Sequence, residues 1–184
     1  RIARLVVPGL AHHVTQRGNR RQPTFFRPLD YRNYCDLLSE HCEKEQVAVW
    51  SYSLLPNHLH LIAVPADAGG LRRALSVAHQ RYTTMINRRE GWKGCLWQGR
   101  FASFPMDERH LWAAIRYVLL NPVRAALCDR AEDWPYSSAE RISQAPISGA
   151  RDHAQRIRLE RDALIGEHRR QSLADFGRAN ALEI

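Results

Sequence analysis

The feature that most constrains the fold is a pair of strand-like stretches joined by a very short connection. Residues 47–55 (VAVWSYSLL) and residues 58–64 are rich in apolar, β-branched and aromatic side chains, and only Pro56-Asn57 separates them. Runs of this composition, bounded by turn-forming residues, are typical of strands. The chain is therefore expected to contain two consecutive strands with a tight turn between them.

The elements around this pair follow a regular order. The expected elements are a strand over residues 11–17, a helix from Asp30 to about Glu45, a helix over residues 71–89 and a strand over residues 100–106. Asp30 occupies the position of a helix N-cap, and apolar residues then recur at spacings of three and four. The order β-α-β-β-α-β predicts an α+β fold, the ferredoxin-like split β-α-β sandwich, with both helices on one face of the sheet.

A further helix is expected after the fourth strand. It should begin at Asp107, a good N-cap, and end at about Asn121, because Pro122 disfavours helical backbone at the residue before it. Its apolar residues form one stripe, whereas Tyr117 and Asn121 lie off that stripe, four residues apart and on the same side. We expect this added helix to cover the sheet face that the other helices leave open.

Length and cysteine content bound the domain organisation and the cellular compartment. The 184 residues fit one domain over residues 1–140 and a charged helical C-terminal extension over residues 141–184, which begins with a polar linker. The four cysteines show no Cys-x-x-Cys spacing, and the chain has no signal peptide and no apolar run long enough to cross a bilayer. These features predict a cytoplasmic protein with reduced thiols and no membrane association.

The positive charge of the chain is concentrated in two segments. The composition of 27 Lys and Arg against 19 Asp and Glu gives a net charge of +8, and the excess lies in residues 1–29 and 72–100. Most of these cations are arginines, whose guanidinium groups match phosphate oxygens in a bidentate manner. Nucleic acid is the favoured partner, while an anionic membrane or a merely solvated surface are the alternatives. The candidate DNA-binding residues are Arg17, Arg20, Arg21, Arg88, Arg89 and Arg100.

Two histidines stand at the start of the third strand, where they share one face. Side chains two apart in a strand point the same way, so His58 and His60 are either tolerated on a wet face or act as a pair of metal ligands. If the added helix covers that face, the Asn121 oxygen can complete a three-ligand site for Mg²⁺ or Mn²⁺. Tyr117 would then stand one turn away as a nucleophile toward phosphorus. The alternatives are an ordinary Asn-Pro turn and a half-buried core tyrosine, with Tyr82 as the next candidate nucleophile.

Several motifs in the same order resemble the single-tyrosine HUH transposases, and within them the REP-associated tyrosine transposases. The resemblance covers about residues 8–140 and rests on HHVTQRGN at 12–19, LPNHLHLI at 55–62, LWQGRFASF at 96–104 and YVLLNPVRAAL at 117–127. It implies a metal bound by His58, His60 and Asn121, a position often occupied by Gln in related transposases. It also implies nicking of single-stranded hairpin DNA through a 5′-phosphotyrosine at Tyr117, and a monomer rather than a dimer.

Two other functions are compatible with these motifs. One is a DNA-binding regulator that kept the fold and lost catalysis, and the other is a metal-dependent phosphohydrolase of small substrates. The second is disfavoured because the basic surface is larger than a mononucleotide needs. Bases in unpaired DNA flanks could stack on Trp50, Trp92 or Trp97, for which packing in the core is the alternative.

Overall fold

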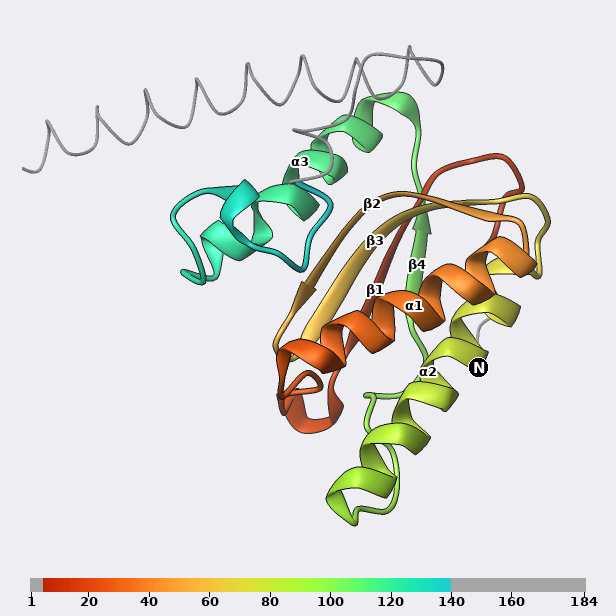
Figure 1. The fold of residues 1–184 in the computed structure, drawn as a ribbon. Helices are drawn as coiled ribbons and strands as arrows, with labels where there is room; N and C mark the ends of the chain where they lie inside the picture. The colour runs from red at the N-terminus through yellow and green to blue at the C-terminus, as the bar shows by residue number, and fades with distance from the viewer. Residues whose placement is uncertain (1–4, 140–184) are drawn as a thin grey trace, which may run out of the picture. The chain divides into compact units, whose positions relative to one another are not determined.

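A four-stranded antiparallel sheet forms the centre of the fold. The computed structural model describes residues 5–139. The strands are β1 (His12–Arg17), β2 (Val47–Leu55), β3 (His58–Pro65) and β4 (Ala102–Pro105), arranged in the order β2-β3-β1-β4 (Figure 1). Every neighbouring pair is antiparallel. This topology confirms the predicted split β-α-β arrangement, in which β1 and β3 occupy the centre and β4 forms a short edge.

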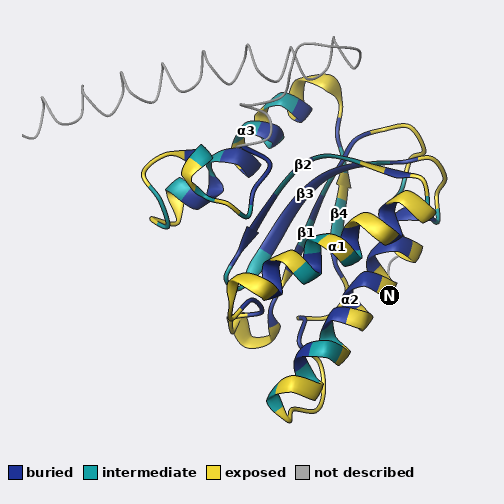
Figure 2. Ribbon diagram, viewed as in Figure 1, coloured by how far each residue is buried: buried dark blue, intermediate teal, exposed yellow. Residues whose placement is uncertain are grey.

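The helices divide between the two faces of the sheet. Helices α1 (Pro28–Lys44) and α2 (Gly70–Glu90) cover one face, and α3 (Glu108–Arg124) packs against β2 and β3 on the other side (Figure 1). Figure 2 shows the sheet as mostly buried and the outer sides of the helices as exposed. The added helix therefore covers part of the open face, as the sequence predicts.

Strict alternation along β3 separates the core from the histidines. Leu59 and Leu61 are fully buried in the cluster that α1 and α2 form with the sheet, where Tyr34 and Tyr82 also lie. Burial of such large apolar side chains contributes about 1.5–3 kcal/mol each. Because the core fixes the leucines on one face, His60 and its neighbour two residues earlier must point to the face of α3.

Two helix ends differ from the expectation. The first helix begins at Pro28, not at Asp30, whose carboxylate instead accepts hydrogen bonds from the amides of Phe26 at 2.9 Å and Arg27 at 3.0 Å. Proline suits the first helical turn because its missing N–H would be unpaired there anyway, so the helix starts two residues early. An acid in the third position can reach back to those amides.

The added helix also ends later than the sequence predicts. Helix α3 continues through Pro122 to Arg124, and the amide of Ala125 still donates to the carbonyl of Asn121 at 2.9 Å. Pro122 lacks one amide donor, but it lies in the last turn, where only one intrahelical bond is lost.

The described residues belong to one compact unit. The predicted extension over residues 141–184, with its linker and charged helix, lies outside the described residues. None of the helices within residues 5–139 is both long enough and apolar enough to cross a bilayer.

Candidate active site

Strand β3 and helix α3 bring the predicted histidines and tyrosine together. In the register of β3 with β1, His58 lies opposite Arg17 and His60 opposite Thr15. The centroids of the two imidazole rings are 5.1 Å apart, and the ring of Tyr117 on α3 lies edge-on to His60 with centroids 5.3 Å apart. Residues nearly sixty positions apart in sequence thus form one polar cluster on the open face.

A third histidine, His13 on β1, joins this cluster. Its Nε2 lies 3.0 Å from Nδ1 of His60, the two rings stack with centroids 5.2 Å apart, and its ring meets Tyr117 at 6.0 Å. Sequence reasoning assigned no role to His13. His13 lies two residues before Thr15 on β1, so the two side chains share one face of the strand. Only the register of β1 with β3, which pairs Thr15 with His60, shows that His13 is a neighbour of His60.

The three histidines of this cluster are neutral at physiological pH. Burial is the main cause that lowers the pKa of His60 to about 3, and electrostatic interactions with His13, His58 and Arg17 lower it further. Burial also lowers the pKa of His13, and burial together with Arg17 lowers that of His58. A neutral imidazole keeps one nitrogen lone pair, which is the form that binds a metal.

The remaining hydrogen bonds leave the Nε2 atoms of both predicted ligands available. Nδ1 of His58 donates to Oδ1 of Asn57 at 2.6 Å, so its Nε2 carries the lone pair. Nδ1 of His60 is occupied by His13, and its Nε2 is buried without a hydrogen-bond partner among the described residues. A buried ring nitrogen without a partner costs free energy unless a ligand satisfies it. This geometry fits a divalent metal.

Asn121 on α3 could supply a third ligand beside His58 and His60. Within residues 5–139, no group of three or more His, Cys, Asp or Glu side chains is arranged to hold a metal ion. Asn121 is 7% exposed and lies on α3 one turn after Tyr117. Its amide oxygen is a hard donor of the kind that Mg²⁺ and Mn²⁺ accept.

The two candidate tyrosines have different environments. Tyr117 is 39% exposed, and the guanidinium carbon of Arg124 lies 5.3 Å above its ring. Tyr82 is fully buried, its hydroxyl donates to the carbonyl of Thr24 at 2.7 Å, and burial raises its pKa. Tyr117 is accessible to a substrate, whereas Tyr82 has a structural role.

The open face continues beyond α3 toward the edge strand. Phe104 on β4 lies opposite His13 in the register, and it is 58% exposed. Helix α3 packs mainly on β2 and β3 rather than on this edge strand. Exposed aromatic rings offer stacking surfaces for unpaired bases.

The predicted DNA-binding arginines fall into three positions. Arg17 borders the histidines, and Arg20 and Arg21 form an exposed turn directly after β1. Arg100 is exposed just before β4. Arg88 is exposed on α2, in the helical layer that covers the opposite sheet face.

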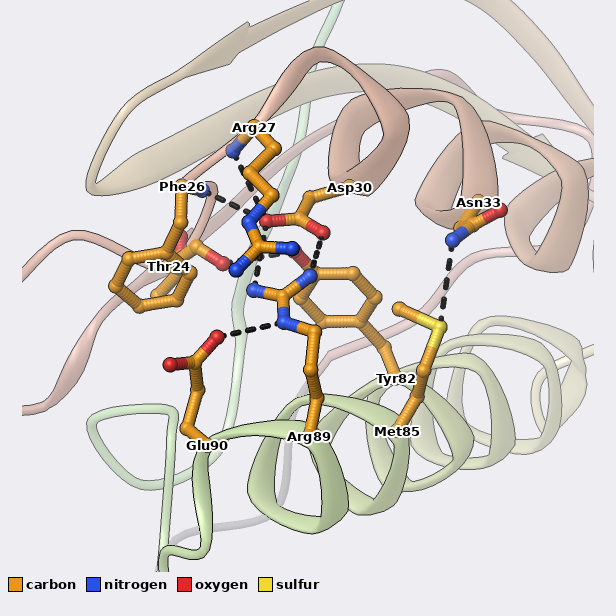
Figure 3. Close-up of polar contacts among 9 residues, drawn as sticks. All are labelled: Thr24, Phe26, Arg27, Asp30, Asn33, Tyr82, Met85, Arg89 and Glu90. Carbon is orange, nitrogen blue, oxygen red and sulfur yellow. Dashed lines mark hydrogen bonds and ion pairs between the residues drawn. The ribbon is translucent and has the colours of Figure 1, made fainter.

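Arg89 is engaged within the protein. Its guanidinium forms a bidentate ion pair with Asp30, which is fully buried, and its Nε donates to Glu90 at 2.6 Å (Figure 3). Burial alone would raise the pKa of Asp30, but hydrogen bonds from Arg89, Phe26 and Arg27 and the charge of Arg89 together lower it. This arrangement gives Arg89 a structural role between α1 and α2.

Two of the tryptophans considered for base stacking differ in their exposure to solvent. Trp97 is 6% exposed and packs in the core, which was the alternative to a role in base stacking. Trp92, in the loop after α2, is 48% exposed. Only Trp92 of these two presents a free ring surface to a partner.

The class of protein to which this chain belongs is shown by its match to a known family. The family model described as "Transposase IS200 like" matches residues 6–120, more than half of the chain, and the chain belongs to this family. The protein is a DNA-processing transposase, and the fold and family inferred from the motifs are confirmed.

Relatives place the chain beside the REP-associated tyrosine transposases. A Haemophilus influenzae protein provisionally named as such is 26% identical over 129 residues, which cover 64% of this chain and 72% of that protein. The solved structure of a REP-associated tyrosine transposase bound to a REP hairpin has the same fold, with a TM-score of 0.62. It is 20% identical and the match covers 83% of this chain and 92% of that one.

Proposed function

We propose that this protein nicks single-stranded DNA beside a hairpin through Tyr117, leaving a 5′-phosphotyrosine and a free 3′-hydroxyl. The observation that carries the proposal is the position of the accessible Tyr117 ring 5.3 Å from His60, whose buried Nε2 has no partner among the described residues. A nucleophile and a vacant ligand nitrogen at this separation suit phosphoryl transfer.

The residues of the cluster have distinct roles in this proposal. As the bond from the Tyr117 oxygen to phosphorus forms, the phenol releases its proton and the bond from phosphorus to the 3′-oxygen breaks. The 3′-oxygen takes up one proton to give the free hydroxyl, and the aryl ester conserves the bond energy for rejoining. A Mg²⁺ or Mn²⁺ ion held by His58, His60 and Asn121 would supply a Lewis acid for the phosphate oxygens. His13 holds the His60 ring through Nδ1, so Nε2 is the nitrogen of His60 that would bind the metal.

A DNA hairpin with single-stranded flanks is the proposed substrate. The net charge of +8 and the exposed arginines beside the site support a polyanionic partner, and the similar solved structure is bound to a REP hairpin. We propose that the protein acts as a monomer. Its four cysteines, Cys35, Cys42, Cys95 and Cys128, are free thiols, which supports a reducing compartment such as the cytoplasm.

A covalent-adduct assay tests the proposal. The protein is incubated with a labelled hairpin that carries single-stranded flanks, with Mg²⁺, with Mn²⁺ or with a chelator, and the products are separated under denaturing conditions. We expect a protein–DNA adduct that needs the metal and is absent in Tyr117→Phe. Tyr82→Phe is the matched control, because it removes a buried hydroxyl outside the site and should retain the adduct.

The same assay distinguishes the rival function. Tight hairpin binding without an adduct under any metal condition would contradict nicking and support a non-catalytic DNA-binding regulator. An adduct that persists in Tyr117→Phe and disappears in Tyr82→Phe would assign the nucleophile to Tyr82.

A further inference from the structure

A cavity of about 620 Å³ lies just beyond the end of β1, outside the histidine cluster. One wall is the turn at residues 19–22, and the other is the loop at residues 92–96 that follows α2. Its volume falls in the range of about 300–1,000 Å³ that is typical of small-ligand sites. The cavity is large enough for one nucleotide unit.

Two exposed aromatic rings line this cavity. Trp92 is 48% exposed and Phe26 is 38% exposed, and their rings meet edge to face with centroids 5.5 Å apart. The guanidinium carbon of Arg89 lies 5.9 Å from the Phe26 ring, and the Phe26 amide donates to Asp30 (Figure 3). Phe26 is thus held in place by its own surroundings while part of its surface stays open.

Hydrogen bonds fasten the two walls. The amide of Asn19 donates to the carbonyl of Leu96 at 2.8 Å, which joins the turn to the loop. Within the second wall, the amide of Trp92 donates to the Asn87 carbonyl at 2.8 Å, and the Asn87 side chain donates to the Gly94 carbonyl at 2.9 Å. A cavity with fixed walls loses little entropy when a ligand binds.

The lining of this cavity is positively charged. Arg20 and Lys93 line it, and none of its described lining residues is acidic. Arg20 and Arg21 both have left-handed backbone, with φ of 54° and 60°, which costs of order 1 kcal/mol or more for a residue with a side chain. Residues held in such conformations cluster at active sites and ligand-binding segments.

The cavity adjoins the proposed active site. Arg17 lies opposite His58 across β1 and β3, and Asn19, which lines the cavity, follows only two residues later, at most about 7 Å along the chain. The amide of Gly18 between them donates to the carbonyl of Asn57, the neighbour of His58, at 2.8 Å. A strand that passes His58 and Arg17 therefore reaches the cavity within a few nucleotides.

We propose that this cavity, the Trp92 pocket formed by Arg20, Phe26, Trp92 and Lys93, binds one unpaired nucleotide of the DNA flank. The base stacks on the exposed face of Trp92, and Arg20 and Lys93 contact its phosphate. Stacking on an aromatic side chain suits any base, so the pocket anchors the flank and the sequence choice is made elsewhere. This inference rests on the proposed function in one respect, that the ligand is single-stranded DNA.

The test measures binding in a Tyr117→Phe background, so that no cleavage is needed. Two labelled hairpins are compared, one with a single-stranded flank and one that is blunt. Trp92→Ala should lower the affinity for the flanked hairpin about 5- to 150-fold and leave the affinity for the blunt hairpin unchanged. Trp92→Phe should retain most of the affinity, and Leu29→Ala, an exposed apolar side chain outside the pocket, is the control.

Two results would overturn the proposal that the Trp92 pocket binds an unpaired nucleotide. One is unchanged affinity of Trp92→Ala for the flanked hairpin, and the other is an equal loss for both hairpins. If Trp92→Ala melts early, Lys93→Gln decides in its place, because it removes an exposed charge without disturbing packing. Unchanged flank binding in Lys93→Gln would then overturn the proposal.

The adduct assay keeps this inference separate from the proposed function. Adduct formation with no effect of Trp92→Ala would remove the pocket and leave nicking through Tyr117 in place. Flank binding that depends on Trp92, without any adduct, would keep the pocket and remove nicking.

Discussion

His13 and His60 are hydrogen-bonded across the two central strands, with Nε2 of the first 3.0 Å from Nδ1 of the second. This bond occupies Nδ1 of His60, whose Nε2 is buried without a hydrogen-bond partner among the described residues. Partners of this kind orient metal-binding imidazoles and fix their tautomer, and their loss commonly lowers metal affinity about 10- to 100-fold.

We therefore predict that His13→Ala lowers Mn²⁺ affinity by about 10- to 100-fold. Isothermal calorimetry measures this without DNA, and adduct formation should fall in parallel at limiting metal. His13→Gln, which can still hydrogen-bond, should recover part of the affinity. Thr15→Ala, on the same face of β1, is the control, and equal Mn²⁺ binding in wild type and His13→Ala would contradict the role.

Loss of either proposed histidine ligand should have a larger effect. His58→Ala and His60→Ala each remove one of three protein ligands, so we expect no measurable Mn²⁺ binding by calorimetry and no metal-dependent adduct. His110→Ala changes an exposed histidine at the start of α3 and should bind Mn²⁺ like the wild type. Normal binding in both ligand variants would refute the metal assignment.

Arg89 should contribute to stability. Arg89→Ala leaves the fully buried Asp30 carboxylate with only two amide donors. Breaking a buried ion pair commonly costs about 3–5 kcal/mol, and because the Arg89 side chain is 26% exposed we expect roughly 2–3 kcal/mol in urea unfolding. A loss below about 0.5 kcal/mol would show that the pair contributes little.

The Asp30 carboxylate should also make stability depend on acid pH. The pKa of Asp30 in the folded state is lowered from the ordinary 3.8. The ionised carboxylate therefore contributes its full stabilisation above pH 3.8, and this stabilisation is lost as the pH falls through the lower pKa of the folded state. Wild type should therefore lose stability below about pH 4 more steeply than Asp30→Asn, which cannot ionise. Denaturant titrations across this range check the difference, and parallel curves would contradict it.

Arg88, unlike Arg89, is not expected to contribute to the stability of the fold. It is exposed, so Arg88→Ala should leave the free energy of unfolding within about 0.5 kcal/mol of wild type. If it contacts a DNA phosphate, the slope of log affinity against log salt should become shallower by about 0.7. Filter binding across a salt series decides between this outcome and a merely solvated arginine, which would leave the slope unchanged.

The sequence was sufficient to predict the features of the fold that depend on residues close together in the chain. The short connection at Pro56-Asn57 and the alternation through β3 correctly placed His58 and His60 on one face, and the element order predicted the sheet topology. These features follow from neighbours in the chain, because strand periodicity and turn chemistry act over a few residues.

Features that depend on distant partners could not be obtained in this way. Arg88 and Arg89 look alike in sequence, and only the packing of α1 on α2 gives Arg89 the carboxylate of Asp30, 59 residues away. The role of His13 likewise depends on a cross-strand register with His60, 47 residues away. Single-residue periodicity carries no information about such pairings.

The alternation along β3 has a consequence for how this lineage can change. Leu59 and Leu61 face the core while His58 and His60 face the site, so an insertion or deletion of one residue in the strand would exchange the two sets. Imidazoles would then enter the apolar interior, and the leucines would lie under α3. The stability of the domain therefore protects the register of β3. Descendants that lose the proposed site should do so by point substitution at the histidines or at Tyr117, and their sheets should keep the same length.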